Sequence, residues 1–205
     1  MASSEPALWT AAIGGQPEEV RRLLAAGVNI DERSRGRETA LHGAVRLGFD
    51  AIVELLLEKG ASVNLRTKFG GRNSALHLAV CGKHVAIVGL LLNRGAGVND
   101  KKDDGASALH LAVRAGHLAI TKLLLGKGAD LVAQGRKPAF SWQTPADLAS
   151  AHANPELAAA FHAEVARRAA LQPGKTPPGP LLTGKTESRN ICARASVVYS
   201  FSVSG

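Results

Sequence analysis

One block of residues recurs along this chain, and its repetition limits the fold more than any single residue does. The clearest copy, residues 107–129, reads SALHLAVRAGHLAITKLLLGKGA. Short segments of good helix formers lie on either side of Gly116, and in the second segment Ile120, Leu123 and Leu124 form a predicted inward stripe of helical period. Helices this short are not stable alone in water. The block therefore needs neighbours of its own kind.

The copies keep a nearly constant register. The tripeptide Ala-Leu-His ends at His42, His77 and His110, so the histidines are separated by 77 − 42 = 35 and 110 − 77 = 33 residues. The glycines that close the copies follow the same intervals: Gly27, Gly60, Gly95 and Gly128. A period of this length predicts a solenoid in which two-helix repeats stack and bury a shared core.

This pattern resembles the ankyrin repeat, whose motif reads Thr-Pro-Leu-His-x-Ala in the first helix and Leu-Leu-x-x-Gly-Ala near the end of the second. The proline of the motif is alanine at Ala40, Ala75 and Ala108 and is retained at Pro145. A proline there preorganises the first turn but supplies no hydrogen bond, so its loss leaves the resemblance intact. The resemblance implies an all-α fold, an ankyrin-repeat solenoid with β-hairpin fingers between repeats.

The repeats divide the chain into two parts. We expect an ankyrin repeat domain over residues 1–171, in which the first and last of about five repeats act as caps. The repeats are expected at roughly 5–31, 32–65, 66–100, 101–131 and 132–170. Residues 172–205 are rich in Pro, Gly and Ser, a composition that cannot build a core, and they are predicted to form a disordered tail.

The middle repeat departs from its neighbours in the turn between its two helices. Lys83 stands where Gly48 and Gly116 stand in the repeats on either side. A glycine at a helix end commonly supplies a positive φ. The turn at Lys83 should therefore be either rearranged or strained.

Composition agrees with small aliphatic packing in an intracellular protein. Hydrophobic residues make up 45% of the chain and aromatic residues 4%, so the core must consist of Leu, Ala, Val and Ile. The two cysteines form neither a disulfide framework nor a zinc spacing. The N-terminal segment lacks the features of a secretory signal, and no apolar run is long enough to span a membrane. We expect a monomer in the cytoplasm or the nucleus that does not contact membranes.

The recurring histidines invite a metal-binding interpretation, which their spacing opposes. One histidine per repeat separates them by about one helix-packing distance, roughly 8–10 Å, whereas zinc ligands lie about 2 Å from a shared ion. In the ankyrin family this histidine instead bridges the backbone and a hydroxyl three residues earlier. The hydroxyls are retained at Thr39, Ser74 and Ser107. We therefore predict a structural role and no metal.

The tail contains a nucleotide-binding pattern without the context that gives it meaning. Residues 179–186, GPLLTGKT, match the P-loop motif. That motif binds phosphate only between a strand and a helix, and here a proline-rich segment precedes it. We interpret the match as coincidental, and we expect a non-enzymatic protein with no catalytic residues and no cofactor.

The loops between repeats carry the more informative differences. The second and fourth fingers span 74 − 60 = 14 and 144 − 128 = 16 residues from closing glycine to capping hydroxyl, and the other two span 12. The longer fingers are also basic and aromatic, which favours a role as contact anchors. Their candidate contact residues are Arg66, Lys68, Phe69 and Arg72 in one, and Arg136, Lys137, Phe140 and Trp142 in the other. Phe140 and Trp142 could equally fold onto the last repeat.

The surface between the fingers and the first helices adds two cations in register, Arg46 and Arg114. The hypothesis is a groove that accepts an acidic, partly hydrophobic segment of a partner protein, since complementary charge steers association. The rival hypothesis is nonspecific binding of nucleic acid or another polyanion, because the net charge is +8. No base-reading motif accompanies that charge, so such binding would be nonspecific and strongly dependent on salt.

Overall fold

The computed structural model describes residues 5–68, 70–131, 133, 144–151 and 154–171. In these ranges the secondary structure is helical, with two isolated antiparallel bridges. The helices are α1 (Ala7–Ile13), α2 (Pro17–Ala25), α3 (Ala40–Leu47), α4 (Asp50–Glu58), α5 (Ala75–Cys81), α6 (Val85–Asn93), α7 (Ala108–Arg114), α8 (Leu118–Gly126), α9 (Pro145–Ala151) and α10 (Pro155–Leu171). The chain divides into a unit that ends at Ala166 and a second that begins at Arg167. The repeats lie in the first unit.

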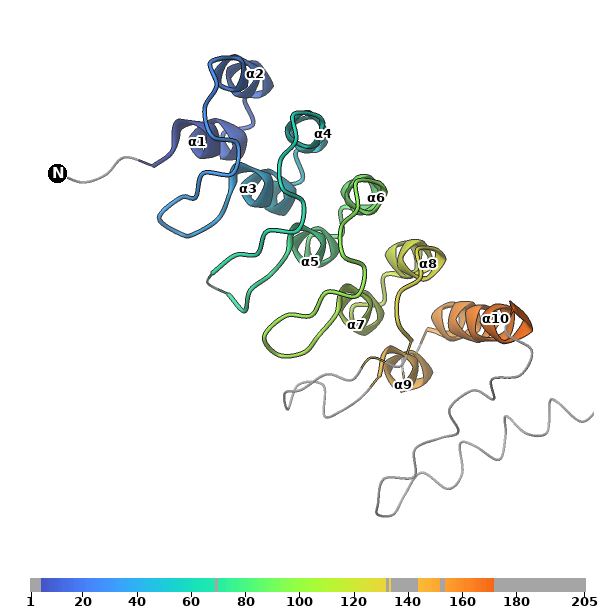
Figure 1. Cartoon of the computed structure of the whole chain (residues 1–205). Coiled ribbons are helices and arrows are strands. Elements are labelled where there is room, and N and C mark those ends of the chain that lie inside the picture. The colour runs from blue at the N-terminus through green and yellow to red at the C-terminus, as the bar shows by residue number, and fades with distance from the viewer. Residues whose placement is uncertain (1–4, 69, 132, 134–143, 152–153, 172–205) are drawn as a thin grey trace, which may run out of the picture. The chain divides into compact units, whose positions relative to one another are not determined.

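Within residues 5–166 the helices stack as repeated pairs. The first helices, α1, α3, α5, α7 and α9, pack one on the next, and the second helices from α2 to α8 form a parallel row (Figure 1). Each first helix also packs on its own second helix from α1 to α8. The predicted all-α fold of stacked ankyrin-type repeats is confirmed. The predicted tail, residues 172–205, lies outside the described residues, as does its P-loop pattern.

The loops before α3, α5 and α7 project from the same side of the stack (Figure 1). We name them finger 1 (residues 31–39), finger 2 (residues 66–74) and finger 3 (residues 100–107). Fingers 2 and 3 are each closed by one isolated antiparallel bridge, Arg66 with Ser74 and Lys101 with Ser107. In the part of the chain that is described, the expected hairpins are thus turns closed by single bridges, without extended strands.

The hydroxyl and histidine of each repeat motif begin the first helix. The hydroxyl oxygens of Thr39, Ser74 and Ser107 accept from the backbone N–H three residues later, and the histidine ring faces back toward the same residue. This reciprocal arrangement satisfies backbone N–H groups that the first helical turn leaves unpaired. The structural role predicted for the motif hydroxyls is therefore found at α3, α5 and α7.

The leucines of the motif form one continuous core. Leu41, Leu76 and Leu109 are buried in the first helices, and Ala112 is buried beside them. The predicted inward stripe of α8 is wrong in one member, because Leu123 is 36% exposed. The buried residues of α8 are Ile120, Thr121, Leu124 and Leu125. The reason is that α8 packs on both α6 and α7, so its buried arc turns toward those two helices.

The turn between α5 and α6 has the same backbone conformation as the turns in the neighbouring repeats, although it has a lysine where they have a glycine. Lys83 has a φ of 62°, beside 76° for Gly48 and 68° for Gly116. A side chain in this left-handed region is unfavourable by about 1–2 kcal/mol. Of the two alternatives that the sequence left open, the structure has the strained turn.

Candidate functional site at the repeat fingers

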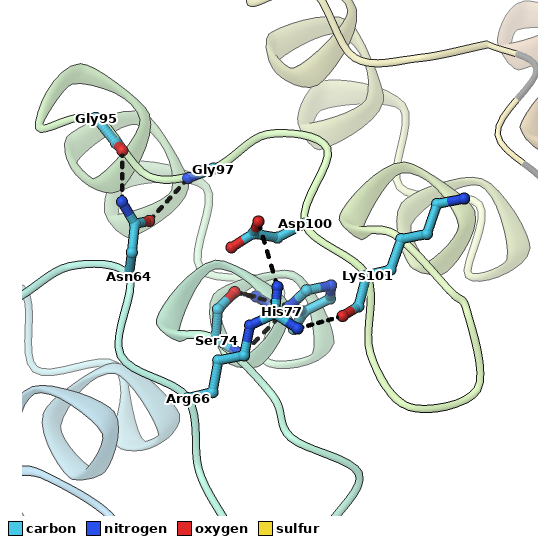
Figure 2. A network of polar contacts seen from close by, with 8 residues as sticks. All are labelled: Asn64, Arg66, Ser74, His77, Gly95, Gly97, Asp100 and Lys101. Atoms are coloured by element: carbon cyan, nitrogen blue, oxygen red, sulfur yellow. Dashed lines mark hydrogen bonds and ion pairs between the residues drawn. The ribbon is translucent and has the colours of Figure 1, made fainter.

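The base of the fingers is held by a regular set of hydrogen bonds between repeats. The Asn64 side-chain amide donates to the Gly95 carbonyl at 3.1 Å, and its oxygen accepts from the Gly97 N–H at 2.9 Å (Figure 2). Asp31 and Asn99 occupy equivalent positions and accept from the N–H groups of Ser62 and Asp130 at 3.0 and 2.8 Å. Each finger therefore starts from a base fixed to the next repeat.

The motif histidine that follows each finger is buried in the first helix of its repeat, and it does not form part of a metal site within the described residues. His77 is fully buried, and its Nδ1 lies 2.7 Å from the Ser74 hydroxyl (Figure 2). Burial lowers the pKa of His77 to about 4, and the positive charges of Lys102 and Arg66 lower it further. In the preceding repeat, His42 Nε2 lies 3.0 Å from the Leu65 carbonyl oxygen, which ties two repeats together. Among the described side chains, no cluster of His, Cys, Asp or Glu could hold a metal ion.

A line of arginines connects the three fingers. Arg33 Nη1 donates to the Arg66 carbonyl oxygen at 3.0 Å. The Arg66 guanidinium in turn donates to the Lys101 carbonyl oxygen and pairs with Asp100 at 3.3 Å (Figure 2). Arg66, a predicted contact residue, is thus engaged between fingers 2 and 3, and its side chain is 29% exposed. Its first role in the structure is to join repeats.

Finger 2 also carries two cations that are free of such contacts. Lys68 and Arg72 are exposed, and neither side chain has a hydrogen bond or ion pair with another described residue. Both lie at an open concavity of about 540 Å³ between fingers 1 and 2. The concavity is lined by Arg33, Asn64, Leu65, Arg66, Thr67, Lys68 and Arg72. No acidic residue is among these lining residues.

The tips of fingers 1 and 2 place arginine in a backbone conformation that favours glycine. Arg72 has a φ of 52° and Arg37 a φ of 58°, whereas finger 3 has Gly105 at 80° in the same register. Arg37 was missed by the sequence reasoning. Aligning Arg37, Arg72 and Gly105 on the capping hydroxyl two residues later could have revealed it. Residues held in sparsely populated backbone regions are found disproportionately at ligand sites.

Two further predicted contact residues, Arg46 and Arg114, are described by the structure and do not line the concavity. Arg46 is exposed near the end of α3 and pairs with Glu38 at 3.2 Å, which partly neutralises it. Arg114 is exposed at the end of α7. The other predicted contact residues lie outside the described residues: Phe69, Arg136, Lys137, Phe140 and Trp142.

Acidic residues flank finger 2 on the side of finger 3. The Asp103 N–H donates to the Gly71 carbonyl oxygen at 3.1 Å, so finger 3 lies directly against the tip of finger 2. Asp103 is exposed, and Asp104 pairs with Lys102 at 3.6 Å. Finger 3 therefore places the exposed Asp103 next to finger 2, together with the exposed Lys101.

Comparison with known proteins identifies the family to which the repeats belong. A family model described as ankyrin repeats (3 copies) matches residues 2–67 and 65–135. A search of curated proteins gave no match to this chain. None of the helices in the described ranges is long and apolar enough to cross a membrane. Ankyrin repeats are typically non-catalytic and commonly serve as protein-interaction modules. With its repeat motif, its stacked helix pairs and this match over more than half of its length, the chain belongs to the ankyrin repeat family.

Proposed function

We propose that this chain is a non-enzymatic interaction module, an adaptor or scaffold, that binds an acidic segment of a partner protein through fingers 1 and 2. The observation that carries the proposal is the pair Lys68 and Arg72, which are exposed and have no partner among the described residues, at a concavity that no described acidic residue lines. Unpaired cations on a preformed surface attract a complementary anionic segment and set its orientation.

The fixed base of the fingers supports this role. Binding loses less free energy to ordering when the contact residues stand on a rigid support. Asn64, just before finger 2, and Arg66, its first residue, hold the start of finger 2 to the following repeat, and Arg33 holds finger 1 to finger 2. A partner would then meet cations whose backbone is already in place.

Other predicted residues fit the proposal as peripheral contacts. Arg114 and Arg46 would add positive charge at the ends of the first helices, and Glu38 pairs with Arg46. The fourth finger, with Arg136, Lys137, Phe140 and Trp142, remains a proposed second contact region, and Phe69 remains a proposed hydrophobic anchor. We also propose that the repeat domain spans residues 1–171 and acts as a monomer in the cytoplasm or nucleus.

Nonspecific binding of a polyanion is the second candidate, favoured by the net charge of +8. The acids of finger 3 oppose it, because a long polyanion at finger 2 would meet Asp103. A filter-binding assay at two salt concentrations distinguishes the two. Retention of nucleic acid that falls steeply with salt and shows no sequence preference would favour the polyanion.

Affinity capture with charge-reversed variants tests the proposal. Lys68→Glu with Arg72→Glu alters finger 2, and Lys59→Glu with Arg94→Glu makes the same change in net charge at exposed ends of α4 and α6. The finger variant should lose specific partner proteins that the control variant retains. If both variants retain every specific partner, fingers 1 and 2 are not the binding surface.

A further inference from the structure

The cations at the concavity exceed what a single carboxylate would neutralise. Arg33, Arg66, Lys68 and Arg72 line the concavity from two fingers, and none of the described lining residues is acidic. Arg66 is paired with Asp100, whereas the other three side chains have no ion pair with a described residue. A carboxylate brings one negative charge, whereas a phosphorylated side chain brings about −1.5 to −2 and three strong acceptor oxygens at neutral pH. The charge of the site therefore matches a phosphate better than a carboxylate.

The Arg33 guanidinium is anchored through one nitrogen, and its other nitrogens remain available as donors. Its Nη1 atom donates to the carbonyl oxygens of Arg37 at 2.8 Å and Arg66 at 3.0 Å. Its Nε and Nη2 atoms make no hydrogen bond to any described residue. A guanidinium offers a rigid fork of donors that fits the oxygens of a phosphate. Anchoring by one nitrogen limits the movement of the Arg33 side chain, which lines the concavity, before any ligand arrives.

Arg72 is the second residue that carries the argument at the same place. Its φ of 52° is a conformation that the third finger assigns to Gly105. Arg72 nevertheless carries a long charged side chain that is exposed and has no partner among the described residues. Because Arg37 has the same conformation and does not line the concavity, the φ value follows from the finger, and it is the exposed side chain of Arg72 that bears on the ligand.

The surroundings of the site indicate a single anionic group on a protein. Finger 3 presents Asp103 against the tip of finger 2, and finger 1 includes Glu32, which is exposed. The repeated phosphates of a nucleic acid would approach these acids, but one phosphorylated residue in a peptide would not. We propose that the concavity between fingers 1 and 2 binds a phosphorylated serine or threonine side chain of the partner protein. This inference rests on the proposed function and names the chemistry of its ligand.

A peptide titration followed by NMR tests the inference on the full-length, isotopically labelled chain. The probes are three blocked tripeptides, Ala-X-Ala, in which X is phosphoserine, aspartate or serine, at constant ionic strength. The phosphoserine peptide should shift the backbone amides of finger 2, and it should bind at least about tenfold more tightly than the aspartate peptide. Equal dissociation constants for these two peptides, or no shift in finger 2 with either, would overturn the inference.

Two arginine-to-glycine variants provide a matched pair. Arg72→Gly and Arg37→Gly remove the same charge from the same strained backbone conformation, so both are expected to fold. Only Arg72 lines the concavity. Arg72→Gly should weaken phosphoserine-peptide binding about tenfold or more, and Arg37→Gly should change it less than about twofold. If both variants weakened peptide binding equally, the loss would reflect net charge alone, and the proposed site at the concavity would be wrong.

The outcomes separate this inference from the proposed function. If Arg72→Gly weakens the phosphoserine and aspartate peptides alike and their affinities are equal, phosphate recognition is wrong and the acidic-segment proposal stands. If neither peptide shifts finger 2 and the Lys68→Glu, Arg72→Glu variant retains every captured partner, both are wrong. Treatment of the lysate with phosphatase before capture should abolish the partners that depend on finger 2. Their full retention would contradict the inference alone.

Discussion

His77 Nδ1 lies 2.7 Å from the hydroxyl oxygen of Ser74, and both side chains are buried. The same contact measures 2.8 Å between Thr39 and His42 and 2.8 Å between Ser107 and His110. An imidazole in this position caps the first helix of its repeat while it is neutral. The stability of the solenoid is therefore coupled to the protonation of its histidines.

This coupling predicts loss of stability in mild acid. The pKa of His77 is lowered to about 4 in the folded protein from an ordinary value of 6.5, so the unfolded chain binds the proton more strongly. Its contribution is complete above pH 6.5 and is lost as the pH falls toward 4, by about 3 kcal/mol in total. Burial lowers the pKa of His42 as well, which adds loss in the same direction. Urea unfolding at pH 7 and pH 5 measures the effect.

The control is His77→Gln, which removes the titrating ring. The variant should be less stable than the parent at pH 7, but its stability should decline less between pH 7 and pH 5. An identical decline in both proteins would show that protonation of His77 does not drive the loss.

The strained turn at Lys83 predicts a stabilising substitution. Lys83→Gly relieves a left-handed side chain with a φ of 62°, and the gain is partly offset by the greater freedom of glycine in the unfolded chain. We expect the free energy of unfolding to rise by about 0.5–1 kcal/mol. Lys59→Gly is the matched control, because Lys59 has a φ of −84° and should lose about 0.5 kcal/mol. If both variants lost stability, the claim that the backbone at Lys83 is strained would be wrong.

The hydroxyl of Thr121 predicts a second stabilising substitution. Thr121 is fully buried in α8, and its Oγ1 has no hydrogen-bond partner in the described part of the chain. Val53 and Val88 occupy the same position in the preceding repeats and are equally buried. Thr121→Val should raise the free energy of unfolding by about 1 kcal/mol, because it removes an unsatisfied polar group without changing shape.

The reverse exchange, Val88→Thr, should lower stability by about 1–3 kcal/mol. Thermal or urea unfolding of both variants measures the pair. A destabilised Thr121→Val variant would mean that the hydroxyl has a bonding partner that valine cannot replace.

The repeat pattern could be recognised from sequence because its signals are local. The leucine and histidine of each Ala-Leu-His motif fall within one helical turn of the capping hydroxyl, and their burial follows from helical periodicity. The strained turn at Lys83 was also foreseeable, since alignment with Gly48 and Gly116 exposes the missing glycine. The exposure of Leu123 was not, because it depends on how α8 is rotated between α6 and α7.

The roles of the finger residues could be predicted only in part. The composition of finger 2 already indicated a basic contact surface. Whether a given arginine is free depends, however, on residues far along the chain: Arg66 pairs with Asp100, and Arg33 bonds to the Arg66 backbone. These contacts arise from the stacking of repeats, which periodicity alone does not describe. Lys68 and Arg72 remain the predicted contact residues with no competing partner among the described residues.

The most direct measurement of the central claim is the dissociation constant of a captured partner for three proteins: the parent, the finger variant and the control variant. Lys68→Glu with Arg72→Glu should weaken binding about tenfold or more, chiefly because an acidic segment would be repelled. Lys59→Glu with Arg94→Glu, which changes net charge equally on another surface, should stay within about threefold of the parent. Equal affinities for the finger variant and the control would contradict an interaction surface at fingers 1 and 2.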